Sequence, residues 1–78
     1  MEITAFLTTD EAHALGRKYA QAGLKLTPHD CKPIDDAIFE QISGLTGTAR
    51  CKAYNALRGA FNHGWNQAYA AQEPNHDH

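Results

Sequence analysis

Hydrophobic and polar positions alternate along the chain with a helical period in three stretches. The first stretch places apolar residues three or four apart on one face: Ala12, Leu15, Tyr19 and Ala22. Thr8 and Glu11 have the spacing of a capping box, in which each residue satisfies a free backbone N–H at the start of a helix. Gly23 stands where a glycine commonly ends a helix. This pattern predicts a helix over about 9–22.

The second stretch repeats isoleucine at four-residue steps: Ile34, Ile38 and Ile42. Pro33 suits the first turn of a helix because its missing N–H has no partner there in any case. Asp35 and Asp36 lie near the same end, where the helix dipole favours negative charge. Gly44 follows the last isoleucine, so the pattern predicts a helix over about 33–43.

The third stretch has no strong helix breaker before Pro74, and Thr46 or Thr48 can cap its start. It therefore predicts the longest helix, over about 48–72. One stripe of this helix has small side chains: Ala49, Ala53, Ala56, Ala60 and Gly64. An adjoining stripe has bulkier ones: Leu57, Phe61, Trp65 and Ala68.

These two stripes cover about half of the circumference of the third helix, which is more than a surface helix ordinarily buries. A row of small residues also lets another helix approach closely. We therefore expect an all-α fold, a small three-helix bundle with a long C-terminal helix, as one domain over 1–72. The polar residues 73–78 are expected to form a disordered tail. The extra apolar surface predicts a homodimer or an obligate partner.

Length and charge restrict the classes of protein that the chain can represent. A chain of 78 residues buries only about 60–65% of its unfolded surface, which disfavours an enzyme with a deep pocket. The net charge of −2 gives no general attraction for nucleic acid or anionic lipid. No apolar run has the ~20 residues of a membrane span, and no signal peptide is recognisable. We expect a cytoplasmic protein in which Cys31 and Cys51 are reduced.

The sequence gives little support for catalysis or for a cofactor. It contains no nucleophile-elbow, phosphate-loop or metalloprotease motif. Four of the His and Cys residues could together supply zinc ligands, but their spacing matches no known zinc site: His29, Cys31, Cys51 and His63. We therefore predict a protein that is not an enzyme and that has no metal or other cofactor.

Basic and aromatic residues occupy one sector of the third helix: Arg50, Tyr54, Arg58 and Trp65. Such residues are enriched in protein–protein hot spots, and they also stack on bases or hold phosphates. Arg50 and Arg58 have no acidic residue within their own helix. They therefore need either the acidic second helix or an outside anion as partner, and direct contact with nucleic acid is left open.

The segment Phe39–Gly59 has the order of a helix-turn-helix motif, with an acidic helix, a short turn and a basic helix. That motif prefers a small residue near position 40 and a branched apolar residue near position 50. Here these positions hold Glu40 and Arg50, and we expect both charges to disturb the packing of the two helices. The order of the elements nevertheless makes a DNA-binding regulator one alternative function.

Two stretches resemble the ribosome modulation factor family of small helical bacterial proteins. The first is AHALGRKYAQAG, which includes Gly16 and Gly23, and the second is GWNQAYA, which begins at Gly64. The resemblance covers about a third of the chain, and it implies an all-helical fold that binds the ribosome and silences translation. Similar patterns recur in short phage proteins that block a host complex, of which an anti-CRISPR protein is one example. Both readings imply a large protein or nucleoprotein partner and no membrane.

Overall fold

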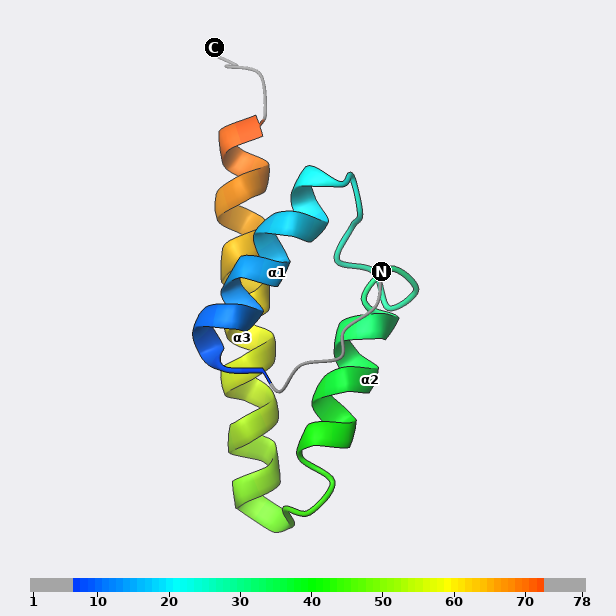
Figure 1. The fold of residues 1–78 in the computed structure, drawn as a ribbon, viewed down its shortest axis with the longest axis vertical. Helices are drawn as coiled ribbons and strands as arrows, with labels where there is room; N and C mark the ends of the chain where they lie inside the picture. The colour runs from blue at the N-terminus through cyan, green and yellow to red at the C-terminus, as the bar shows by residue number, and fades with distance from the viewer. Residues whose placement is uncertain (1–6, 73–78) are drawn as a thin grey trace.

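The computed structural model describes residues 7–72 and consists of three helices joined by short loops. Helix α1 spans Thr9–Gln21, α2 spans Lys32–Gln41 and α3 spans Gly47–Gln72. Helix α3 runs the length of the molecule, α1 crosses its C-terminal half, and α2 lies beside its N-terminal half in the opposite direction (Figure 1). No strand occurs in this part of the chain. The predicted all-α class with a long C-terminal helix is confirmed, and the predicted tail at 73–78 lies outside the described residues.

Local signals fix both ends of α1. The Thr8 side chain accepts a hydrogen bond from the Glu11 backbone, and the Glu11 carboxylate accepts one from the Thr8 backbone, which completes the predicted capping box. At the other end Gly23 has a φ of 83°, which a glycine adopts without a Cβ clash. The N–H of Gly23 donates to Ala20, and the N–H of Leu24 donates to Tyr19, as in a Schellman motif.

Helix α2 ends earlier than the sequence predicts. Its last residue is Gln41, and Ile42 takes the C-cap position. Ser43 N–H then donates to the carbonyl of Glu40, and Leu45 N–H donates to that of Ile42. These tight turns satisfy the last carbonyl groups, so Gly44 keeps a negative φ and does not form a left-handed cap.

Helices α1 and α3 cross at two glycines. A Cβ built on Gly16 would overlap the carbonyl oxygen of Phe61 and lie 2.8 Å from the backbone nitrogen of Trp65. A Cβ on Gly64 would likewise overlap the carbonyl oxygen of His13. Each glycine therefore lets the backbone of the other helix approach, as the small-residue stripe predicts for Gly64.

The rest of the small-residue stripe differs from that prediction. Ala49 and Ala56 are exposed, because α1 crosses only the C-terminal half of α3. The stripe therefore does not form one continuous helix contact (Figure 1).

The core lies between the three helices, and Tyr19, Ile38 and Phe61 are among its largest completely buried side chains. The rings of Tyr19 and Phe61 meet edge to face, with their centroids 4.9 Å apart. Ile34 and Ile38 of α2, its C-cap residue Ile42 and Leu57 of α3 pack into the same cluster. The bulky stripe of α3 is thus largely core, since Leu57, Phe61 and Ala68 are buried.

The Tyr19 hydroxyl is a polar group within this apolar core. It is buried without a hydrogen-bond partner among the described residues, which costs about 1–3 kcal/mol for a polar group. We expect Tyr19→Phe to leave the free energy of unfolding unchanged or to raise it by about 1 kcal/mol. Urea denaturation followed by circular dichroism tests this, and a loss of 1 kcal/mol or more would show that the hydroxyl has a stabilising partner.

Tyr19 also makes the free energy of unfolding depend on pH in the alkaline range. Burial raises the pKa of Tyr19, and the neighbouring Cys31 and Asp35 raise it further. Burial also raises the pKa of Tyr54. Because folding favours the neutral phenols, their contribution to stability should be constant below the ordinary tyrosine pKa of about 10 and fall as the pH rises through the raised values. Burial also raises the pKa of the Cys31 thiol, so a smaller fall should begin above the ordinary cysteine pKa of about 8.5. Tyr19→Phe should make this fall shallower.

Candidate functional site

Six residues of α3 form a continuous stripe, which we call the α3 flank. They follow one another at steps of three or four residues: Cys51, Tyr54, Arg58, Asn62, Trp65 and Tyr69. At about 100° per residue they fall within about 80° of the helix circumference. Three of the four predicted binding residues belong to this flank, and the fourth, Arg50, lies beside it.

Arg58 and Tyr54 are tied to α2 by one carboxylate. The Arg58 guanidinium donates to Oδ1 of Asp35 in an ion pair, and the Tyr54 hydroxyl donates to the same oxygen over 3.2 Å. Arg58 also donates from Nε to Asn62 over 3.1 Å, and its guanidinium lies 5.4 Å from the centre of the Phe61 ring. Of the two partners predicted for Arg58, the structure provides the acidic second helix.

The electrostatics of this group favour its charged form. Burial alone would lower the pKa of Arg58, but the hydrogen bond that Arg58 donates to Asp35 and the nearby charges outweigh burial and raise the pKa above its ordinary value. The guanidinium therefore stays charged, and Arg58 braces α2 against α3. Arg50 differs from Arg58, because it is exposed and no described residue pairs with it.

A first hollow, which we call the Tyr54 pocket, opens between α2 and α3. The rings of Phe39 and Tyr54 stack with centroids 5.2 Å apart and planes 9° apart. The Phe39 side chain is 46% exposed, which is unusual for a large apolar residue. The hollow has a volume of about 360 Å³, and six residues line it: Phe39, Ile42, Arg50, Cys51, Tyr54 and Asn55. Its wall is therefore mainly apolar, and the cationic side chain of Arg50 forms part of the lining.

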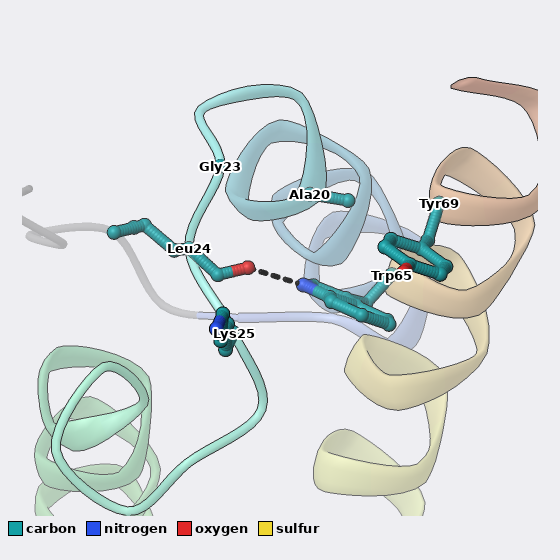
Figure 2. A pocket seen from close by; sticks show the side chains of 6 residues that line it. All are labelled: Ala20, Gly23, Leu24, Lys25, Trp65 and Tyr69. Atoms are coloured by element: carbon teal, nitrogen blue, oxygen red, sulfur yellow. Dashed lines mark hydrogen bonds between the residues drawn. The ribbon is translucent and has the colours of Figure 1, made fainter. Parts of the chain in front are cut away.

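A second hollow, which we call the Trp65 pocket, lies at the other end of the flank. Figure 2 shows the indole N–H of Trp65 pointing at the carbonyl oxygen of Leu24, to which it donates over 2.7 Å. The Trp65 and Tyr69 rings stack with centroids 4.7 Å apart and planes 11° apart. The hollow has a volume of about 290 Å³, and six residues line it: Ala20, Gly23, Leu24, Lys25, Trp65 and Tyr69.

The loop after α1 builds one wall of the Trp65 pocket. Gly23 turns the chain so that the Leu24 carbonyl faces α3, and the Asp30 carboxylate holds the next backbone N–H, that of Lys25, at 2.9 Å. The Lys25 side chain is exposed and makes no ion pair with a described residue. Trp65 belongs to the bulky stripe of α3 but is only half-buried, and Tyr69 is 46% exposed.

Sequence reasoning missed several residues of these two pockets. Tyr69 follows Trp65 by four residues, so the helical period alone could have indicated their contact. In the sequence, Phe39 follows Ile38 and only widens the apolar face of the second helix. Leu24 and Lys25 lie in a loop, where no period exists, and only the path of the chain after Gly23 brings them to α3.

The residues with metal-binding or nucleophilic side chains are spread over the fold. The described residues include no group of three or more His, Cys, Asp or Glu side chains that could hold a metal ion. His13 and His63 approach each other, with ring centroids 5.4 Å apart, and His13 makes a hydrogen bond with Gln67. Neither pocket has a histidine or a carboxylate in its lining, so Cys51 has no general base beside it there.

The two cysteines are free thiols in different surroundings. Cys31 is fully buried, its thiol faces the Lys25 carbonyl over 3.6 Å, and burial raises its pKa. Cys51 is exposed. We expect a thiol reagent such as Ellman's reagent to modify Cys51 rapidly and Cys31 only as the protein unfolds.

Absorbance at 412 nm would follow both phases, and Cys51→Ser should remove the fast one. Rapid modification of two thiols in the folded wild-type protein would contradict this assignment.

Helices α2 and α3 are arranged differently from the two helices of a helix-turn-helix motif. Helices α2 and α3 form a hairpin whose arms run in opposite directions (Figure 1), whereas the two helices of that motif cross steeply. Glu40 and Arg50 are both exposed, so the expected clash between their charges and the helix contact does not arise. The arrangement is an antiparallel hairpin with the Tyr54 pocket between its two helices.

Comparisons with known proteins and a search for membrane spans add two findings. No protein-family model, curated protein or solved structure matches this chain. Among the described residues, no helix combines the length and the apolar character that crossing a bilayer requires.

Proposed function

We propose that this protein is a non-catalytic binding protein, which regulates or inhibits a larger protein or nucleoprotein assembly by occupying part of its surface. The observation that carries this proposal is the α3 flank with its two apolar pockets, each beside an exposed cation without a described partner. Tryptophan, tyrosine and arginine in such surroundings are the residues that most often dominate protein–protein binding.

The ribosome is the first candidate assembly, because the resemblance to ribosome modulation factor indicates it. Gly16 and Gly64, which carry much of that resemblance, meet at the crossing of α1 and α3. These glycines therefore support a shared way of packing two helices, and they say little about the surface that binds. A host protein complex, blocked in the manner of a phage inhibitor, is the alternative.

The pockets also favour a protein contact over a nucleic-acid contact. Each pocket has a single cation in its lining, Arg50 in one and Lys25 in the other. Binding to a nucleic-acid backbone usually depends on many Lys and Arg side chains that neutralise phosphates together. Apolar walls with one cation suit a protein surface that offers an apolar side chain and a carboxylate.

The test compares capture of assemblies by the tagged protein and by a pocket variant, Phe39→Ala with Tyr69→Ala. Leu45→Ala is the control, because Leu45 is also an exposed apolar residue and lines neither pocket. We expect wild type and control to retain the same assembly from a cell lysate with and without nuclease, and the pocket variant to lose it. Equal retention by all three proteins would refute the proposed site, and loss only after nuclease would indicate binding through nucleic acid.

A further inference from the structure

The two pockets share one side of the molecule. Tyr54 and Trp65 both belong to the α3 flank, and Arg58 and Asn62 lie between them on the same stripe. Trp65 follows Tyr54 by eleven positions, which corresponds to about three helical turns and about 16 Å along α3. A single binding partner can therefore reach both pockets without leaving the flank.

The spacing of the flank is that of a helix–helix contact. Its members recur at steps of three or four residues, as do the contact positions of helices that pack side by side. In a partner helix, two residues eleven positions apart also share a face, because eleven steps of about 100° return to within about 20° of the start. An amphipathic helix laid along the flank would thus present one apolar side chain to each pocket.

The charges beside the α3 flank indicate which charged side chains a partner helix needs. Arg50 lines the Tyr54 pocket, Lys25 lines the Trp65 pocket, and neither pocket includes a carboxylate in its lining. The carboxylate nearest to the middle of the flank, Asp35, already bonds Arg58 and Tyr54. Helix α3 itself contains no acidic residue. These two exposed cations, one in the lining of each pocket, are complementary to acidic side chains on the partner.

We propose that the α3 flank binds an acidic amphipathic helix of a protein partner. Its two apolar anchors are eleven residues apart and enter the Tyr54 and Trp65 pockets, and its carboxylates pair with Arg50 and Lys25. This inference rests on the proposed function and specifies the chemical class of the partner surface.

The single tryptophan of the chain provides the assay, because Trp65 lies in one of the two pockets. The probe is a designed alanine-rich helical peptide of about twenty residues, long enough to be helical alone. It carries two leucines eleven positions apart and a glutamate within one turn of each leucine. We expect saturable binding with a change in Trp65 fluorescence, and at least tenfold weaker binding when the leucines are seven positions apart.

Variants of the protein test each contact separately. Phe39→Ala and Tyr69→Ala should each weaken binding of the peptide about tenfold, the loss expected when one buried anchor is truncated. Arg50→Glu should weaken it by a similar factor, and a peptide with lysine in place of the facing glutamate should restore binding. Lys52→Glu is the control, since it makes the same change of charge on the opposite side of α3 and should have little effect.

Four results would overturn the proposal. The first is binding that does not saturate by about 1 mM peptide, and the second is equal affinity for the two leucine spacings. The third is an equal loss of affinity from Arg50→Glu and from Lys52→Glu. The fourth is self-association of the protein that changes Trp65 fluorescence without peptide. The last result would assign the flank to a second copy of the chain. If the pocket variant loses the captured assembly but no peptide binds, the proposed function stands and only the helical partner is wrong.

Discussion

Gly64→Ala is expected to lower the free energy of unfolding by several kcal/mol. A Cβ at this position would overlap the carbonyl oxygen of His13 and lie 2.9 Å from its carbonyl carbon. Both are backbone atoms, so no rotamer change relieves the clash, and α1 has to move away from α3. Because α1 contributes Tyr19 and Ala12 to the core, this movement opens the centre of the molecule.

The expected size of the effect follows from the stability of small domains. A protein of this length has about 4–12 kcal/mol of stability at ~0.05–0.15 kcal/mol per residue. Loss of close packing along α1 should remove several kcal/mol, comparable with the loss when a large core side chain is truncated. Circular dichroism at 222 nm during urea denaturation measures this, and Gly16→Ala should have a similar effect because its Cβ meets the backbone of Phe61 and Trp65.

Gly59→Ala is the matched control for both substitutions. Gly59 lies in the same helix as Gly64, but a Cβ built on it meets no atom within 4 Å. Alanine is the better helix former by about 1 kcal/mol, so this variant should be more stable than wild type. A folded Gly64→Ala protein with stability near that of wild type would show that the two helices do not cross as closely as Figure 1 depicts.

The ends of the helices show which parts of the fold can be predicted from the sequence. The start of α1 depends on Thr8 and Glu11, three residues apart, and its end depends on Gly23. Such signals act over one turn, so they can be recognised without tertiary information. The end of α2 depends instead on turns through Ser43 and Leu45, whose residue types do not specify them, and the prediction was two residues too long.

The candidate site divides in the same way. Helical periodicity was enough to place Tyr54, Arg58 and Trp65 in one sector of α3. Periodicity could not tell which of the two arginines faces a partner. That depends on where α2 ends, because Asp35 reaches Arg58 whereas Arg50 lies exposed beside the Tyr54 pocket. The sequence left two kinds of partner open for Arg50 and Arg58. The structure pairs Arg58 with the acidic second helix and gives Arg50 no partner among the described residues.

Charge patterning was informative about one contact only. Acidic and basic blocks alternate along the sequence, which suggests that helices of opposite charge pack together. The described residues contain one ion pair between helices, Arg58 with Asp35, and one within α2, Lys32 with Asp36. Asp35 contacts α3 while the adjacent Asp36 is exposed, because neighbouring residues of a helix point about 100° apart.

The ion pair of Arg58 and Asp35 should therefore be a stabilising brace. Their side chains are only 16% and 23% exposed, and the Tyr54 hydroxyl shares the same carboxylate oxygen. Removing one partner leaves a half-buried charge without its counterion, so Asp35→Ala and Arg58→Met should each lower the free energy of unfolding by about 2 kcal/mol. This is less than for a fully buried pair, because solvent screens part of the charge.

A double-mutant cycle separates the ion pair from the packing of its side chains. In the variant with both substitutions no unpaired charge is left, so its loss of stability should be about 1 kcal/mol smaller than the sum of the two single losses. The exposed pair Lys32 and Asp36 is the control, since its side chains are 72% and 61% exposed and its removal should not be measurable. Strictly additive effects of Asp35→Ala and Arg58→Met would show that the two residues do not interact in solution. Arg58 would then be free to contact the partner together with Arg50.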